Sequence, residues 1–397
     1  MSFLKKQSHY FLLFCVFMLS LEDTFGAERI RFATFNTSLY RQSEGELARE
    51  LTSGNSESAR KIAEIIQIVR PDVILLNEFD YDLDSNSIDQ FFTNYVGVSQ
   101  NGKKPIDFTH RFSAAVNTGV TSQQDLNNDG KVEGPVDAFG YGVFPGQYGM
   151  VVASKYPIKR KAIRTFQRFL WKDMPGALWP KVQTDNSDYY SDDAKAVFRL
   201  SSKSHWDVPI DVNGKTIHFL VFHPTPPVFD GPEDRNGRRN HDEIRFWADY
   251  ISPKKSYYLY DDQAKRGGLK NEARFVIAGD ANADPFDGDS HKNAINLLLK
   301  HPLVNPVQPS SQGGAEQSKV QGGKNRFHKG SPALDTADFG DTGRASGNLR
   351  IDYVLPSSNL TVQDSGVFWP RSDQPGFELI DATDHRLVWV DVSINSD

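Results

Sequence analysis

The pattern of apolar and polar residues predicts strands that alternate with helices along much of the chain. Residues 29–36 alternate between apolar and polar, as in a strand with one buried face. Apolar runs that are typical of buried strands occupy residues 73–76, 148–153, 215–222 and 275–278. Between the first two strands, apolar residues recur at helical spacing from Ala59 to Val69, after an N-cap at Asn55 or Ser56 and before Pro71. This order of elements predicts an α/β fold in which helices cover a sheet.

The remaining segments show shorter or weaker patterns. We expect further helices at residues 46–51, 241–251 and 294–299, and further strands at residues 196–200, 349–355 and 386–392. Residues 160–193 lack a clear period, and residues 305–348 are dominated by Gly, Ser, Gln, Asn and Pro, so we expect an insertion and a long flexible loop there. No repeat or linker divides the chain. We therefore expect one domain over residues 27–397, with insertions near residues 101–147, 160–195 and 305–348.

The N-terminus has the pattern of a secretory signal peptide. Two lysines precede an apolar run at residues 11–21, which is too short to span a bilayer as a helix. We expect residues 1–26 to be removed by cleavage near Gly26 and Ala27, which gives a secreted or periplasmic protein without a membrane span. The only cysteine, Cys15, lies in this run, so the mature chain has no disulfide.

Charge limits the kinds of partner. The formal net charge of −6 at pH 7 leaves no general basic surface for nucleic acid, so any contact with a polyanion must be local. We expect a monomer without a stable protein partner.

Polar side chains follow or interrupt several predicted strands in a way that suggests a metal site. They are Asn36, Glu78, His223, Asp280, Asn282, Asp352, Asp384 and His385. Asp280 and Asn282 would point the same way in extended backbone, although an Asx turn after the strand explains them equally well. Carboxylates and amides without thiols suit Mg²⁺, Mn²⁺ or Ca²⁺ rather than zinc, and two imidazoles can transfer protons near neutral pH. Each residue alone could also be a helix cap or part of a turn. The hypothesis of a metal site therefore depends on the recurrence of such residues at the ends of several strands.

A second candidate for cation binding lies in a polar segment. Its candidate residues are Asp125, Asn127, Asp129, Lys131 and Asp137. The first three, with Gly130, match the front half of a calcium loop. Val136 occupies the twelfth position, where an acid is expected, and the acid follows one residue later. The alternative is a polar surface turn.

Two further stretches are candidates for contact with substrate. The segment after His223 carries Arg235, Arg238, Arg239 and His241. Guanidinium groups suit phosphate oxygens, although these arginines could instead pair with neighbouring acids in a solvated loop. Residues 203–207 could bring the aromatic ring of Trp206 to the rim of a site, unless that ring belongs to the core.

Seven segments, in order along the chain, resemble the endonuclease/exonuclease/phosphatase superfamily, which is also called deoxyribonuclease I-like. They are FATFN (32–36), PDVILLNE (71–78), YGMVVASKYPI (148–158), FLVFHP (219–224), IAGDANADP (277–285), RIDYVL (350–355) and ATDHRLV (382–388). Asn77 stands where glutamine is more usual, and Thr383 replaces a serine. The resemblance implies a four-layer α/β sandwich, in which two central mixed β-sheets are flanked by helices and the site lies at one end of the sheets.

The resemblance also implies roles for the site residues. Glu78, with Asn36 and Asp384 nearby, would hold Mg²⁺ or Mn²⁺. Asp280 would orient or deprotonate the attacking water, and Asn282 would hold a phosphate oxygen. His385, aligned by Asp352, would stabilise the transition state or donate a proton, with His223 near the leaving group.

The implied function is divalent-metal-dependent hydrolysis of phosphodiester bonds in nucleic acid or a small organophosphate. A phosphomonoesterase acting on small-molecule, inositol or lipid phosphates remains the alternative. A catalytically silent binding module is disfavoured, because Glu78, Asp280 and His385 are all present.

Overall fold

The computed structural model describes residues 28–84 and 86–394. The predicted signal peptide and Cys15 lie outside these residues. Within the described residues, none of the helices combines the length and the apolar character needed to cross a membrane.

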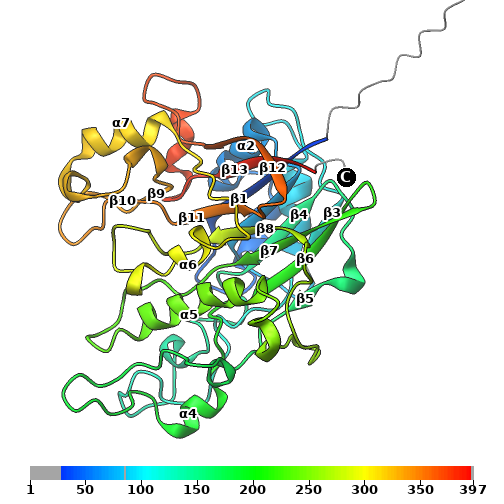
Figure 1. Cartoon of the computed structure of the whole chain (residues 1–397). Helices are drawn as coiled ribbons and strands as arrows, with labels where there is room; N and C mark the ends of the chain where they lie inside the picture. Colours follow the sequence, from blue (N-terminus) through cyan, green and yellow to red (C-terminus); the bar gives the residue numbers. More distant parts are fainter. Residues whose placement is uncertain (1–27, 85, 395–397) are drawn as a thin grey trace, which may run out of the picture.

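Two β-sheets form the centre of the molecule (Figure 1). The first sheet has the spatial order β12 (Leu360–Val367), β13 (Val388–Ile394), β1 (Arg29–Leu39), β2 (Val73–Phe79), β4 (Met150–Ser154) and β3 (His110–Phe112). The second has the order β11 (Asp352–Pro356), β8 (Arg274–Asp280), β7 (Lys215–Phe222), β6 (His205–Val212) and β5 (Arg164–Thr165). Strands β1 and β2 are parallel, as are β7 and β8, while their other neighbours run antiparallel. Both sheets are therefore mixed.

Apolar side chains of the two sheets pack against each other and form the middle of the core. Phe32 of β1 meets Phe219 of β7 with ring centroids 5.4 Å apart. Trp206 of β6 is fully buried in this same cluster. Trp206 thus belongs to the core. Of the two interpretations of residues 203–207, the one that placed this ring at the rim of a site is wrong.

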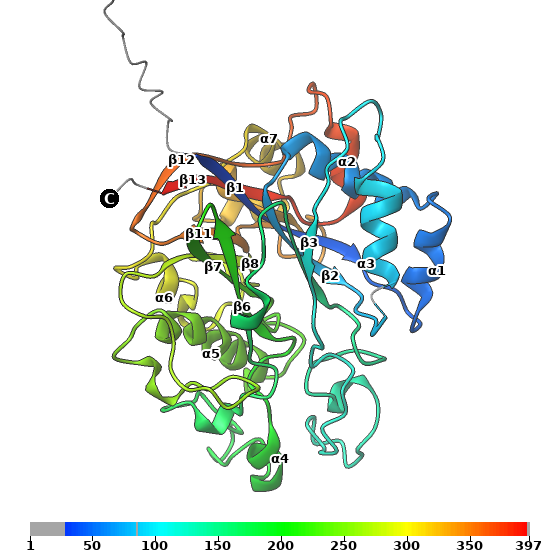
Figure 2. The same ribbon diagram turned by 90° about the vertical axis from the view of Figure 1, so that its right-hand side faces the viewer.

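Helices cover the outer face of each sheet, so that the molecule has four layers (Figure 2). The helices α1 (Glu46–Thr52), α2 (Glu57–Val69) and α3 (Asn86–Phe91) pack on the first sheet, and α5 (Arg235–Tyr250) and α6 (Asn296–Leu299) pack on the second. Helix α2 begins as expected, with the Ser56 hydroxyl accepting from Ala59 N, and ends at Arg70 in the left-handed region. The predicted four-layer α/β sandwich is confirmed.

The segment at residues 305–348 is not the long loop that its composition predicts. It contains α7 (Gln312–Gln321) and a small sheet of β9 (Ala337–Asp338) and β10 (Asn348–Leu349). The Ser311 hydroxyl caps α7 by accepting from Gly314 N. A Cβ at Gly313 would lie 2.3 Å from the Trp369 carbonyl oxygen. Glycine in this segment therefore serves close packing rather than flexibility.

Three other predictions about elements were wrong in part. Residues 196–200 do not form the predicted strand. Residues 196 and 197 belong to helix α4 (Asp192–Val197), which the Ser191 side chain caps, and residues 198–200 follow this helix. Helix α5 begins six residues before the predicted position 241. The predicted strand at residues 349–355 is divided between β10 and β11.

Short helical segments complete the fold. They are the π-helical η1 (Phe92–Val96) and the 3₁₀ segments η2 (Pro135–Asp137), η3 (Arg160–Ala162), η4 (Trp171–Asp173), η5 (Ser256–Tyr258), η6 (His291–Asn293), η7 (Gly323–Phe327), η8 (Pro332–Leu334) and η9 (Phe377–Ala382).

Candidate active site

The candidate site residues meet at one edge of the sandwich. Parallel strands end at the same edge of a sheet, and β1, β2, β7 and β8 bring Asn36, Glu78, His223 and Asp280 there. Asp352, at the start of β11, pairs directly with Asp280, and His385 precedes β13. The Asn36 amide nitrogen lies 3.1 Å from Asp280 Oδ2 and 3.3 Å from His385 Nε2. The sequence prediction that these side chains converge is met by the structure.

Two residues beside the site shape its framework. Within the second sheet, Gly279 of β8 lies close to the end of β7, since a Cβ there would lie 2.1 Å from the Phe222 carbonyl oxygen. The buried Asn77 amide joins the sheets: its oxygen accepts from Thr34 Oγ1 at 3.3 Å and from Asp280 N at 3.4 Å. Its nitrogen donates to Phe222 O at 3.4 Å. Asn77, noted in the sequence only as a departure from a motif, thus connects four strands.

The Asp280 carboxylate is the centre of the site. Oδ2 accepts from Asn36 and lies 3.3 Å from His223 Nε2, while Oδ1 accepts from Asn282 N at 2.8 Å. Burial acts to raise the pKa of Asp280, but the nearby imidazoles of His385 and His223 outweigh it and hold that pKa below its ordinary value. Asp280 therefore stays ionised.

Asn282 is not in extended backbone, so the expected common orientation with Asp280 was wrong. Its φ of 50° is left-handed, and its backbone N–H closes an Asx turn on Asp280. The side-chain amide donates to Pro224 O at 3.2 Å and thereby holds the segment that follows His223. The Asx turn after β8 is therefore part of the candidate site.

His385 and Asp352 form a buried pair. His385 Nδ1 donates to Asp352 Oδ2 at 2.9 Å, and Thr336 Oγ1 donates to the same oxygen at 2.8 Å. Burial opposes a charge on His385, but the carboxylates of Asp352 and Asp280 raise its pKa to about 10. Burial raises the pKa of Asp352 to about 6. This arrangement fixes the ring and keeps His385 able to donate a proton or a hydrogen bond.

His223 has the opposite character. Burial, aided by the positive charge of Lys203, lowers the pKa of His223 to about 4. Its Nδ1 is buried and has no hydrogen-bond partner among residues 28–84 and 86–394. A neutral imidazole and a charged one therefore flank the same aspartate, which separates a proton acceptor from a proton donor.

The residues fit a hard divalent cation. Among the histidine, cysteine, aspartate and glutamate residues that the structure describes, one group of three could hold a metal ion. It consists of Asp280, Asp352 and His385, whose possible ligand atoms all lie within 4.8 Å of one another. Asp352 Oδ1 is buried without a partner among those residues. Glu78 lies beside this group at a left-handed φ of 56°, and burial raises its pKa. Asp384 is half exposed at the rim, 3.9 Å from His385 Nε2.

Lys203 is a component of the site that the sequence did not identify. It precedes β6 and is 7% exposed. Burial lowers the pKa of its ammonium, against the negative charges of Glu78, Glu243 and Asp280. Within the described residues, this ammonium has no hydrogen bond or ion pair. A buried cation without a direct partner is costly, and an anionic ligand would compensate it.

Glu243 of α5 binds the two backbone segments that carry Lys203 and His223. Its Oε1 accepts from Ser202 N at 2.6 Å and its Oε2 from Thr225 N at 2.7 Å. The carboxylate is fully buried. It thus ties the segment before β6 to the segment after β7. No sequence pattern indicated this role, because Glu243 lies on a helix whose periodicity marks only its apolar face.

The prediction of an arginine-rich loop is wrong, because the four basic residues lie on helix α5. The buried Arg239 donates to the carbonyl oxygens of Leu200 and Phe139 and is therefore a structural group. Arg235 pairs with Glu233, and His241 Nδ1 lies 3.1 Å from Asp242 Oδ1. Arg238 lies 3.9 Å from Asp234. The alternative interpretation is met in part: Arg235, Arg238 and His241 lie beside neighbouring acids, but on a helix rather than in a solvated loop, and Arg239 does not pair with an acid.

The candidate calcium loop is closed by its own backbone. Asp125 accepts from Asp129 N at 3.2 Å and from Gly130 N at 2.9 Å. Asp137 is buried and accepts from Leu126 N and Glu133 N, so it joins the two ends of the loop. Lys131 N donates to Asp129 Oδ1 at 2.9 Å. Calcium binding by this loop stays a prediction.

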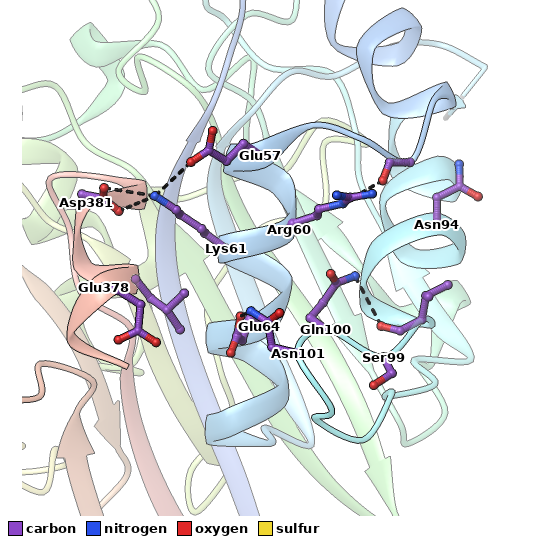
Figure 3. A pocket seen from close by; sticks show the side chains of 13 residues that line it. Glu57, Arg60, Lys61, Glu64, Asn94, Ser99, Gln100, Asn101, Glu378 and Asp381 are labelled. Carbon is purple, nitrogen blue, oxygen red and sulfur yellow. Dashed lines mark hydrogen bonds and ion pairs between the residues drawn. The ribbon is translucent and has the colours of Figure 1, made fainter. Parts of the chain in front are cut away.

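A separate hollow of about 740 Å³ lies on the outer face of α2 (Figure 3). Its charged groups largely satisfy one another: Lys61 pairs with Asp381 at 2.9 Å, and the Glu64 carboxylate accepts from Asn101 at 2.6 Å. None of the candidate catalytic residues lines it. We assign it no chemistry.

Known proteins resemble this chain in sequence and in fold. Residues 33–385 match the model of the Endonuclease/Exonuclease/phosphatase family. A search of curated proteins found no match. Among solved structures, the endonuclease/exonuclease/phosphatase from Beutenbergia cavernae DSM 12333 is similar in fold, with a TM-score of 0.50 and 16% identity over 93% of this chain and 72% of that chain.

Two other solved structures resemble the chain less closely. A family protein from Bacteroides thetaiotaomicron has a TM-score of 0.47 and 12% identity over 94% of this chain and 100% of its own. Beta toxin from Staphylococcus aureus, solved with bound magnesium ions, has a TM-score of 0.44 and 14% identity over 93% of this chain and 100% of its own. The family match covers most of the chain, and the predicted resemblance is confirmed. The chain belongs to the endonuclease/exonuclease/phosphatase family.

Proposed function

We propose that this hydrolase of phosphoester bonds is exported and cleaves phosphodiesters with the help of a bound Mg²⁺ or Mn²⁺ ion. The observation that carries the proposal is the position of Asp280 between two imidazoles of opposite protonation state. Export follows from the predicted signal peptide at residues 1–26.

Each side chain has a task in this reaction. Asp280 orients the attacking water, since its lowered pKa makes it an acceptor of hydrogen bonds rather than a strong base. His385, fixed by Asp352, donates a hydrogen bond to the phosphoryl group as negative charge grows on it. His223 lies on the other side of Asp280, where it can exchange a proton with the leaving group. Asn36 donates to Asp280 and so fixes this carboxylate beside His385.

The donor set indicates how a metal would be held. Glu78 with Asp280 or Asp352 offers carboxylate oxygens, which Mg²⁺ and Mn²⁺ prefer, and Asp384 at the rim can reach a hydrated ion. A bound divalent ion supplies charge neutralisation and polarises the phosphoryl oxygens.

Charge favours a diester over a monoester. Four carboxylates, those of Glu78, Asp280, Asp352 and Asp384, face the cations of Lys203 and His385, while the nearby Arg386 lies 3.9 Å from a further carboxylate, that of Asp338. One divalent ion brings this set to about neutrality, and a monoanionic diester is then less repelled than a dianionic monoester. The alternative, a phosphomonoesterase, is favoured only by Lys203, whose unpaired ammonium would gain more from a dianion.

The test compares initial rates on plasmid DNA, RNA, bis-p-nitrophenyl phosphate and p-nitrophenyl phosphate, with Mg²⁺, with Mn²⁺ and with EDTA. We expect hydrolysis of diesters that EDTA abolishes and added Mg²⁺ restores. The Asp280→Asn variant keeps the size of the side chain and should lose at least ~10²-fold in rate, the scale of removing one catalytic group. Asp287→Asn, on the loop after β8, is the matched control. A preference for the monoester above about tenfold would replace the diester proposal by its alternative, since it would reverse the charge argument.

A further inference from the structure

We propose that Tyr40 and Tyr148 form a stacking platform beside the metal-binding side of the site, and that it holds a planar ring such as a nucleobase on the substrate. This inference rests on the proposed phosphodiesterase function. It specifies the group that the scissile phosphate carries.

The backbone brings the two tyrosines to Glu78 from different strands. Leu39 of β1 pairs with Phe79 of β2, so Tyr40 lies next to the residues that follow Glu78. Phe79 N donates to Gly149 O at 3.1 Å, which places Tyr148 opposite the same end of β2. Both side chains are half-buried. The ring centroids are 4.5 Å apart with an interplanar angle of 43°.

A single buried carboxylate fixes both segments. Asp80 is 6% exposed; its Oδ2 accepts from Arg41 N at 2.7 Å and its Oδ1 from Tyr148 N at 3.1 Å. Gln147 adds a bond from its amide nitrogen to Arg41 O at 2.6 Å. The residues that carry the two rings are therefore held to each other and to the end of β2, two residues from Glu78. A platform fixed in this way loses little entropy when it binds a ligand.

Backbone strain at Tyr148 supports a function for its position. Its φ of 55° lies in the left-handed region, where a bulky side chain is an outlier. Such strain persists where surrounding bonds impose it, and here Asp80 does so. Burial and then the negative charges of Glu78 and Asp384 raise the pKa of Tyr40, which places its phenol near the metal-binding carboxylates.

The surroundings suit a neutral ring at least as well as a cationic group. The carboxylates of Glu78 and Asp384 act on Tyr40 with negative charge. A divalent ion held by these carboxylates, as in the proposed function, would offset that charge, so a quaternary ammonium would gain little from it. The flat face of a base stacks on an aromatic ring without needing a charge.

The experiment uses substrates that share one leaving group. Thymidine 5′-(p-nitrophenyl phosphate), methyl p-nitrophenyl phosphate and p-nitrophenylphosphorylcholine all release p-nitrophenol, and they differ only in the group that could reach the platform. We expect the wild-type chain with Mg²⁺ to prefer the thymidine ester in kcat/KM by about tenfold or more, the scale of stacking one base. Tyr148→Leu and Tyr40→Leu should reduce this preference to near one, whereas Tyr148→Phe should retain it.

The ratio of two substrates in one variant does not depend on how much of the variant is folded. Tyr257→Leu, at an exposed tyrosine in η5, is the control and should keep the wild-type ratio. Equal effects of Tyr148→Leu on all three substrates, or a wild-type preference for the choline ester, would overturn the platform. If the wild-type chain hydrolyses none of these diesters with Mg²⁺ or Mn²⁺, the proposed function itself fails.

Discussion

Glu243→Gln is the change whose effect can be worked out most directly from the structure. The carboxylate accepts one backbone N–H on each oxygen, from Ser202 and from Thr225, and it is fully buried. Glutamine has almost the same shape but only one acceptor, so its amide nitrogen would face a backbone N–H. Hydrogen bonds to charged groups contribute roughly 1.5–3 kcal/mol each, and a buried donor left without an acceptor costs about as much. We therefore expect a loss of about 2–4 kcal/mol in the free energy of unfolding.

Urea denaturation of the full chain measures this loss. The matched control is Glu57→Gln, which removes a largely exposed carboxylate of α2 whose ion pair with Lys61 should contribute at most ~1 kcal/mol. At a temperature where both variants are folded, Glu243→Gln should also lower kcat, because the segments that carry Lys203 and His223 are no longer tied together. An unfolding free energy within about 1 kcal/mol of wild type would refute the argument that one carboxylate fixes both segments.

The remaining predictions concern a cation and a buried histidine. Lys203→Met keeps the length of the side chain and removes its charge; we expect a fall of at least ~10-fold in kcat/KM, which Lys203→Arg should partly restore, while the exposed Lys131→Met changes nothing. An unchanged kcat/KM in Lys203→Met would exclude contact with the phosphate. His205 is buried, and burial lowers its pKa from 6.5 to about 3 in the folded chain. The unfolded chain therefore binds a proton that the folded chain does not, so the free energy of unfolding should fall as the pH drops below about 6.5, by at most ~1.4 kcal/mol per unit for this group. Urea titrations between pH 7.5 and 4.5 measure the slope, and a His205→Phe variant without a smaller slope would contradict this assignment.

The sequence predicts that Asn36, Glu78, His223 and Asp280 lie close together because each stands at the end of a strong apolar run. A strand that enters the core leaves its polar terminal residue at the sheet edge, and parallel pairing then brings such ends together. Asn36, Glu78, His223 and Asp280 follow this rule, and all four meet in the structure. The rule needs no knowledge of tertiary contacts, which is why the pattern alone is sufficient.

The supporting residues could not be found in this way. Glu243 and Asn77 act through contacts between elements that are distant in sequence, and nothing in their local pattern differs from a helix surface or a strand end. The basic residues of α5 were wrongly predicted to lie in a loop, for a different reason. Their composition resembles a polar loop, but Arg239 is buried because three backbone carbonyls accept from it. At residues 311–321, glycine and serine signalled flexibility where they permit a capped helix to pack closely.

The bridge made by Asn77 has a consequence for how the enzyme can fail. Asn36 and Glu78 lie in the first sheet, and His385 precedes its strand β13. Asp280 and Asp352 lie in the second sheet, and His223 directly follows its strand β7. Neither sheet holds a complete set, so catalysis depends on their alignment to within a hydrogen-bond length. A small sliding of one sheet over the other would separate Asn36 from Asp280 without exposing the apolar core. Substitutions deep between the sheets, far from any phosphate, would then silence the enzyme while the chain remains folded.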